Sequence, residues 1–165
     1  MDRSEIFAER LKRARIGKGY SMAELAAAMG GSVSKMAISK YEQNKMLPNS
    51  SVVILLSKAL EKPVDYFVRP FSVSIDSIKF RKRKSVLSVK DENAIRENIS
   101  DLIERYINIE EICDAGVSFV SPFQRPIICA DEIKNAALEL RRRWNIDLAG
   151  IVSVVELLET HGFKV

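Results

Sequence analysis

Residues 34–45 read SKMAISKYEQNK, and their spacing predicts a short helix with two unlike faces. Ala37, Ile38 and Tyr41 fall on one side of this helix and form a narrow apolar stripe. Ser34 suits the N-cap position, because its hydroxyl can accept a hydrogen bond from a backbone N–H that otherwise lacks a partner. A helix of this length is not stable by itself, so its apolar side must pack against neighbouring elements.

The opposite face of this helix is polar and basic. It contains no acidic residue and has the size and chemistry to enter the major groove of double-stranded DNA. We therefore expect residues 34–43 to be a recognition helix. The side chains expected to face base edges are Lys35, Met36, Ser39 and Gln43, and those expected to contact phosphate are Lys40, Asn44 and Lys45.

The preceding residues predict a second short helix that packs against the first. Ser21 and Glu24 have the S-x-x-E spacing of a capping box, in which each side chain satisfies a backbone N–H of the other residue. An apolar side follows, and two glycines then end the helix: Leu25, Ala26, Met29, Gly30 and Gly31. Two short helices joined by a small-residue turn, the second with a basic outer face, are typical of a helix-turn-helix motif.

Residues 7–68 resemble the DNA-binding domains of the XRE, or phage-repressor-like, family. The matching residues are Arg15, Gly19, Ser21, Glu24-Leu25-Ala26, Ala37-Ile38-Ser39-Lys40-Tyr41-Glu42 and Pro48. The resemblance implies an ion pair between Arg15 and Glu42 that ties the first helix to the recognition helix. The alternative to the ion pair is an exposed Arg15 without a structural role. The alternative to the family resemblance is a small helical bundle whose basic helix does not bind DNA. We also expect DNA contact at Ser21, Met22 and Ser34.

Composition restricts the classes of protein to consider. Apolar residues make up 47% of the 165-residue chain and charged residues 29%, as in a globular protein. No apolar run approaches the roughly 20 residues that span a membrane, and the charged N-terminus does not fit a secretion signal. The two cysteines and the single histidine lack metal-ligand spacing, so we expect reduced thiols, a cytoplasmic protein and no cofactor.

The predicted fold is mainly α-helical. Five helices are expected in a helix-turn-helix domain over residues 1–70, and a second, mostly helical region over residues 91–165. Between them, residues 71–90 begin with the alternating pattern of a half-buried strand at 71–75 and then become strongly basic. This basic stretch is either an arm that contacts DNA or a solvated linker.

The net charge of +4 is distributed unevenly along the chain. Residues 1–70 hold 12 basic and 7 acidic side chains (+5), residues 71–90 hold 6 and 1 (+5), and residues 91–165 hold 8 and 14 (−6). The basic half therefore coincides with the helix-turn-helix motif and the segment after it, which is typical of a nucleic-acid-binding protein.

Cap and breaker signals predict the remaining element boundaries. In the first region they place a helix after Asp2, a helix from Ser50 or Ser51, and a short turn at 64–67. In the second region they predict a long helix from Ser88 to Gly116, helices at 131–144 and 151–158, and the start of a strand at 163–165.

The longest periodic segment predicts a dimerisation helix. Its apolar residues are spaced alternately by four and three, which is the period of helix-on-helix packing: Ile95, Ile99, Leu102, Tyr106, Ile109 and Cys113. We call the first five of these residues the seam, and we expect it to pair with a second copy of the chain. Ile103, Ile107 and Ile112 widen the apolar stripe, so packing within the chain is the alternative. We expect both contacts together, with one edge of the stripe packed on Leu140 and Trp144 and the other on the second copy.

Residues 71–165 also resemble the region that precedes the zinc peptidase core in regulators of the ImmA/IrrE metallopeptidase family. The matching segments are 66–71, 80–82, the helix after Ser88, Ala136-Ala137-Leu140-Arg141-Trp144, 155–159 and 162–165. The catalytic H-E-x-x-H motif of that family is absent from this sequence, whose single histidine is His161. We therefore expect no enzymatic activity in these residues.

Together these patterns favour a bacterial or phage sequence-specific transcriptional regulator, repressor-like, that binds double-stranded DNA as a homodimer. Two alternatives stay open. The chain could be the DNA-binding front of a zinc peptidase regulator whose reading frame continues past Val165. It could also be an antitoxin-like module that binds a protein partner through residues 91–165.

Overall fold

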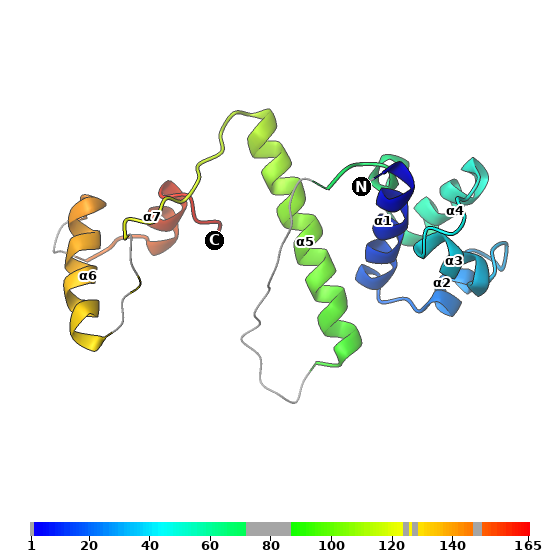
Figure 1. Ribbon diagram of the computed structural model, residues 1–165, viewed down its shortest axis with the longest axis horizontal. Coiled ribbons are helices and arrows are strands. Elements are labelled where there is room, and N and C mark those ends of the chain that lie inside the picture. The colour runs from blue at the N-terminus through cyan, green and yellow to red at the C-terminus, as the bar shows by residue number, and fades with distance from the viewer. Residues whose placement is uncertain (1, 72–86, 124–125, 127–128, 147–149) are drawn as a thin grey trace. The chain divides into compact units, whose positions relative to one another are not determined.

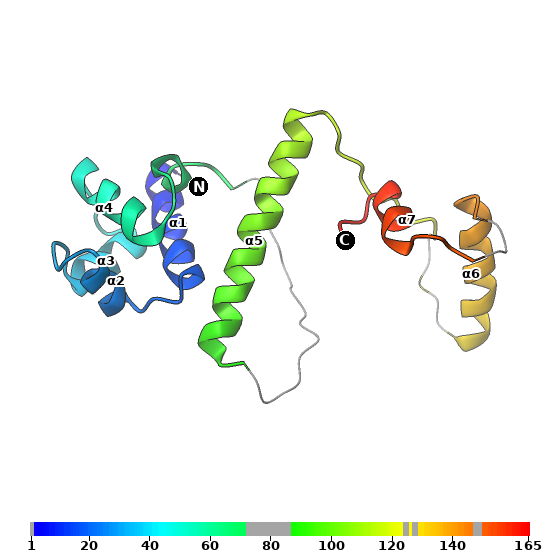
Figure 2. The same cartoon turned by 180° about the vertical axis from the view of Figure 1, so that it is seen from behind.

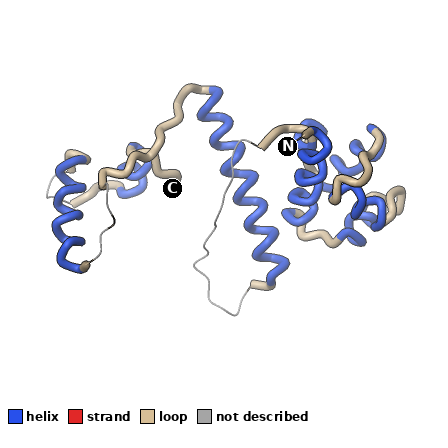
Figure 3. The backbone as a smooth tube through the Cα atoms, in the orientation of Figure 1, coloured by secondary structure: helices blue, strands red, loops and turns tan. Residues whose placement is uncertain are grey.

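The computed structural model describes residues 2–71, 87–123, 126, 129–146 and 150–165 (Figure 1). The chain divides into two compact units, Met1–Ile109 and Glu110–Val165, and each is described by itself. The described residues form helices and loops, with no strand among them (Figure 3). This confirms the prediction of a mainly α-helical fold. Most of the strand expected at 71–75, and the basic residues 79–84, lie outside the described residues.

The first unit contains five short helical elements and most of one long helix. The elements are α1 (Arg3–Gly17), α2 (Met22–Ala28), α3 (Lys35–Glu42), α4 (Ser50–Leu60), the 3-10 helix η1 (Val64–Phe67) and α5 (Val89–Ile112). The last three residues of α5 belong to the second unit, which also contains α6 (Ala130–Arg143) and α7 (Val154–Thr160). None of the helices in the described ranges is long and apolar enough to cross a membrane.

Side-chain caps fix where the first four helices begin. Asp2 and Glu5 form a capping box at α1, and Ser21 and Glu24 form another at α2. Asn49 caps α4 by accepting a hydrogen bond from the backbone N–H of Val52 at 3.0 Å. These starts agree with the cap signals in the sequence, because a cap depends only on residues within one helical turn.

One apolar core is shared by the helices α1, α2, α3, α4 and η1. Leu11, Leu25, Ile38, Leu56 and Phe67 are fully buried in it, one from each of these elements. The core includes no buried side chain from α5, whose one buried residue is Glu104. The helix-turn-helix domain therefore has its own core, and α5 is held against it in another way.

Two boundaries in the second half differ from the sequence-based expectation. The long helix ends at Ile112, four residues before Gly116, and Asp114 takes the left-handed conformation that ends it, with φ at 51°. The last helix begins at Val154 instead of at residue 151, because the Ser153 hydroxyl accepts from the backbone N–H of Glu156 at 3.2 Å and caps it there.

The second unit is small and is held together by rings and exposed polar contacts. Trp144 stacks on His161 with their ring centroids 4.0 Å apart, and Phe119 lies 4.3 Å from Phe163. The prediction of a strand at 163–165 is wrong, because these residues form a loop. A strand needs a neighbouring strand to pair with, and the described segments of this unit contain none. The packing of Leu140 on the seam involves both units and stays a prediction.

Candidate nucleic-acid interface

The helix-turn-helix motif consists of α2, a glycine turn and α3. Gly30 and Gly31 have φ values of 66° and 72°, a conformation that side chains with a Cβ rarely adopt, and they turn the chain between the two helices. Ile38 and Tyr41 point from α3 into the apolar core. The inner side of α3 is thereby fixed, as its apolar stripe predicts, and its other side is turned outward.

The outward side of α3 carries the residues that the sequence singled out. Lys35, Lys40 and Gln43 are exposed, as is Met36 with 73% of its surface accessible. Ser39 is half-buried, and its hydroxyl accepts from the Gln43 side-chain amide at 3.0 Å. This contact holds the Gln43 amide against the helix and gives it a preferred direction, which residue spacing alone does not reveal.

The loop after α3 begins with a tight turn at Asn44. Its φ of 54° is left-handed, a conformation that asparagine tolerates better than most residues. The backbone N–H of Lys45 then bonds to the carbonyl of Lys40 at 2.9 Å. Asn44 and Lys45 are both exposed directly beyond the end of the recognition helix, so the structure brings them beside Lys40.

The two serine caps are exposed at the starts of α2 and α3. Ser21 accepts from the backbone N–H of Glu24 at 3.2 Å, and Ser34 accepts from that of Ala37 at 3.1 Å. A hydroxyl that accepts in this way can also donate, so the Ser34 hydroxyl can bond to a phosphate oxygen while it caps α3, whereas the Ser21 hydroxyl also bonds to the Glu24 carboxyl. The backbone N–H of Ser21 is the main cause that lowers the pKa of the Glu24 carboxyl. Met22 packs partly against the core, and DNA contact by it stays a prediction.

Arg15 and Glu42 form a bidentate ion pair beneath the recognition helix. Arg15 Nε lies 2.6 Å from Glu42 Oε1, and Nη2 lies 2.8 Å from Oε2. The remaining guanidinium nitrogen, Nη1, donates to the backbone carbonyl of Tyr20 at 2.8 Å. The side chains are only 12% and 3% exposed. The pair therefore links α1 to the end of α3 at a site that is largely shielded from water.

A second arginine of α1, Arg10, is buried, although charged residues on a helix are normally expected to face solvent. Its guanidinium meets Glu104 of α5, and the two side chains are 1% and 5% exposed. Burial by itself lowers the pKa of Arg10, but hydrogen bonding to Glu104 and the charge of that residue outweigh it, so the pKa is raised. The position had a signal, since Arg10 lies three residues after Phe7 and four before Ala14, on the buried stripe.

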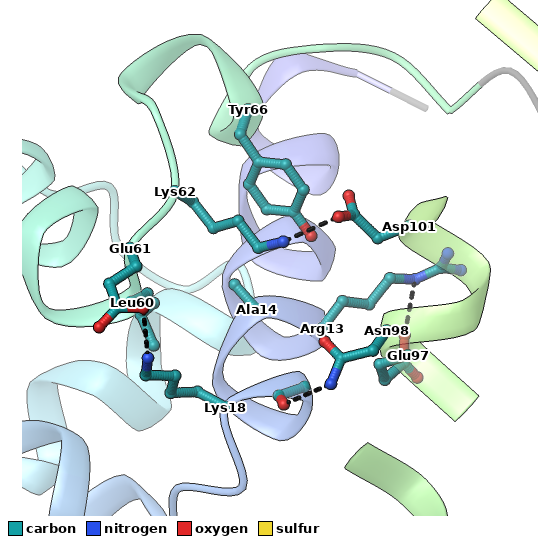
Figure 4. A pocket seen from close by; sticks show the side chains of 11 residues that line it. Arg13, Ala14, Lys18, Leu60, Glu61, Lys62, Tyr66, Glu97, Asn98 and Asp101 are labelled. Carbon is teal, nitrogen blue, oxygen red and sulfur yellow. Dashed lines mark hydrogen bonds and ion pairs between the residues drawn. The ribbon is translucent and has the colours of Figure 1, made fainter. Parts of the chain in front are cut away.

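Polar side chains hold α5 against the rest of the first unit (Figure 4). Lys62 Nζ lies 2.8 Å from Asp101 Oδ2, and the Asn98 amide donates to the carbonyl of Gly17 at 3.0 Å. Arg13 lies 4.0 Å from Glu97, whose carboxyl pKa is raised by burial despite that positive charge. These groups line a cavity of about 260 Å³. The contacts come from the acidic side of α5.

The seam lies on the opposite side of α5. Leu102 and Ile109 are each 61% exposed and Tyr106 is 50% exposed, while Ile95 and Ile99 are half-buried. Within the first unit, α5 is therefore an amphipathic helix with its charged side inward and its apolar side outward, the reverse of the usual surface helix.

The comparisons with known proteins concern the first unit. Residues 11–67 match the helix-turn-helix family model. No curated protein and no solved structure matches the chain. The resemblance of residues 71–165 to peptidase regulators therefore stays a prediction. Residues 11–67 run from the middle of α1 to the end of η1 and include α2, the glycine turn and α3. This segment is an XRE-type helix-turn-helix domain, and such a domain implies DNA binding.

Proposed function

We propose that this protein is a sequence-specific transcriptional regulator, repressor-like, that places α3 in the DNA major groove and binds as a homodimer. The observation that carries the proposal is the outer side of α3, where Lys35, Met36 and Lys40 are exposed without an acidic neighbour on that side. A helix that reads base pairs in the major groove needs an outer side with cationic and hydrogen-bonding groups. Its inner side must be packed firmly on the domain.

The electrostatics of the chain support a nucleic-acid partner. The acidic side chain of α3, Glu42, is neutralised by Arg15 on the inner side of the helix and so does not repel phosphate. Residues 1–70 have five more basic than acidic side chains. Positive charge around an exposed recognition helix attracts DNA of any sequence, and contacts to base edges then supply the selectivity.

The exposed part of the seam on α5 supports a homodimer. A single helix-turn-helix reads few base pairs, and two copies on half-sites about one DNA turn apart read more. The seam offers a second copy an apolar surface whose 3.5-residue spacing suits helix pairing, since Leu102, Tyr106 and Ile109 face outward. A pair of α5 helices related by a two-fold axis would bury the same seam on both copies.

We further propose that these 165 residues act by binding and not by catalysis. The sequence has one histidine and no H-E-x-x-H motif. Among the residues that the structure describes, no group of three or more His, Cys, Asp or Glu side chains is placed to hold a metal ion. The regulatory effect would then come from occupying an operator.

Selection of DNA from a random duplex pool tests the proposed function. The full chain should enrich two inverted copies of one short sequence, about one DNA turn apart. Sedimentation of the same preparation should give a dimer. A folded protein that enriches no sequence would contradict sequence-specific binding, and enrichment of one isolated half-site by a monomer would contradict the dimer alone.

Replacing Lys40 by alanine should weaken binding to every duplex to a similar extent. Each copy loses one phosphate contact, so the slope of log affinity against log salt should fall by about 0.9 for one half-site and by about twice that for the dimer on its operator. The measurement is a salt titration of affinity on the selected operator and on an unrelated duplex. Lys134→Ala makes the same charge change at an exposed position of α6 and should leave the slope unaltered. An unchanged slope for Lys40→Ala would remove this residue from the DNA interface.

Replacing Gln43 by alanine should instead change which sequences are preferred. Its amide is oriented by Ser39 and can bond to a base edge, and one such contact contributes about 1–3 kcal/mol of discrimination. Competition between the operator and variants of one base pair should show relaxed preference at one position of each half-site. The salt dependence should stay as in the wild type, which separates this effect from that of Lys40→Ala. Retained preference at every position would place Gln43 away from the bases.

A further inference from the structure

The surroundings of Arg10 are those of a positioned group and not of an incidental ion pair. Its Nε donates to the carbonyl of Arg69 at 3.0 Å, and Nη2 donates to the carbonyl of Pro70 at 2.8 Å. Nη1 lies 2.8 Å from Glu104 Oε2, and Nη2 also reaches Oε1 of the same carboxylate. The Phe71 ring covers the guanidinium, with its centroid 4.0 Å from Cζ. The guanidinium is therefore held by two backbone carbonyls, one carboxylate and one aromatic ring.

The Arg10–Glu104 pair is one of two arginine–glutamate pairs that attach other helices to α1. Arg10 binds Glu104 of α5, and five residues later Arg15 binds Glu42 at the end of α3. Figures 1 and 2 both place α1 between α5 and α3. The helix proposed to dimerise and the helix proposed to read DNA are thus both attached to α1 by bidentate arginine–glutamate pairs.

We propose that Arg10 and Glu104 are positioning residues that set the direction of α5 relative to the recognition helix, and hence the spacing of the two half-sites that a dimer reads. This inference rests on the proposed function. It assigns the pair a role in geometry, whereas the DNA contacts themselves come from α3 and its neighbours.

The chemistry of the Arg10–Glu104 contact suits a role in fixing the angle of α5 better than a role in merely holding α5 to the domain. Apolar contacts are non-directional, and α5 adds no buried residue to the apolar core. A bidentate guanidinium–carboxylate pair has a fixed planar geometry, so it constrains the angle of the helix that carries the carboxylate. Buried ion pairs often add little net stability compared with apolar residues of similar volume, and their best-attested use is to specify register and arrangement.

The other contacts of α5 allow the helix to stay attached when the pair is removed. Asp101 is held by Lys62, and Asn98 is held by the carbonyl of Gly17. A variant that lacks only the Arg10–Glu104 geometry should therefore keep α5 close to α1 but let its angle vary. The expected consequence is a dimer that accepts several half-site spacings.

Selection from the random duplex pool with variants of the pair tests this role. Glu104→Gln keeps the shape of the side chain and removes its charge. The double variant Arg10→Met with Glu104→Leu replaces both partners by apolar groups and leaves no buried charge behind. Glu111→Gln, an exposed position later in α5, is the matched control. Each protein is also titrated with a duplex that carries one half-site.

The wild type and Glu111→Gln should enrich one narrow half-site spacing. A folded variant of the pair should enrich the same half-site sequence over a range of spacings, and its affinity for one half-site should stay within about twofold of the wild type. An unchanged narrow spacing in either folded variant would overturn the proposal. So would loss of single-half-site binding, or failure of both variants to fold, because the pair would then support the domain itself. A wild type that enriches no sequence would overturn the proposed function, and this inference with it.

Discussion

Replacing Glu42 by alanine should lower the free energy of unfolding of the helix-turn-helix domain by about 3 kcal/mol, since it leaves the charge of Arg15 shielded and without its carboxylate. Two of the three bonds that the Arg15 guanidinium makes are lost, and the bond to the carbonyl of Tyr20 cannot replace them. Thermal melts should show a drop in Tm on the order of 10 °C for a unit of this size.

A double-mutant cycle measures the coupling between the two residues. Arg15→Ala and the double variant Arg15→Ala with Glu42→Ala complete it, and the double variant should be less unstable than the two single effects predict. If the losses of unfolding free energy in the two single variants simply add up in the double variant, the two residues do not act as a pair. The matched control is Glu61→Ala, because the Glu61 carboxylate also pairs with a cation, Lys18, but is 73% exposed. That change should leave the melting temperature nearly unaltered.

The sequence predicted the helix-turn-helix domain well because the relevant signals are local. The capping boxes of Asp2 and Ser21, and the apolar stripe of Ile38 and Tyr41, each lie within one or two helical turns. The pairing of Arg15 with Glu42 spans 27 residues. It was implied by the family resemblance, since spacing along the chain says nothing about a contact at that distance.

The attachment of α5 was not predictable in the same way. Arg10 and Glu104 are 94 residues apart, and charged residues on a helix are normally read as a solvated side. The sequence of α5 offers both an acidic side and an apolar seam, and periodicity does not say which of them turns inward. The choice depends on the partner surface, where Arg10, Arg13 and Lys62 present cations to the acidic side.

Replacing Leu102 and Ile109 together by glutamate should convert the proposed dimer into a folded monomer. Both side chains are 61% exposed, so the first unit loses little packing of its own, whereas the dimer would have to bury four new carboxylates. Ile99 is a poorer choice, because it is half-buried and a charge there would disturb the unit that carries it. Sedimentation should therefore give a monomer with the helical content of the wild type.

The loss of pairing should appear in DNA binding as a loss of avidity. Affinity for the two-half-site operator should fall by roughly 10²–10⁴-fold, because the second half-site is no longer bound by a linked copy. Affinity for a duplex with one half-site should be unchanged, since α3 is untouched. Val120→Glu with Val152→Glu makes the same chemical change at two exposed positions of the second unit and should leave the dimer intact. A Leu102→Glu, Ile109→Glu protein that stays dimeric would place the two-fold contact outside the seam, and the outward apolar side of α5 would then need a different partner.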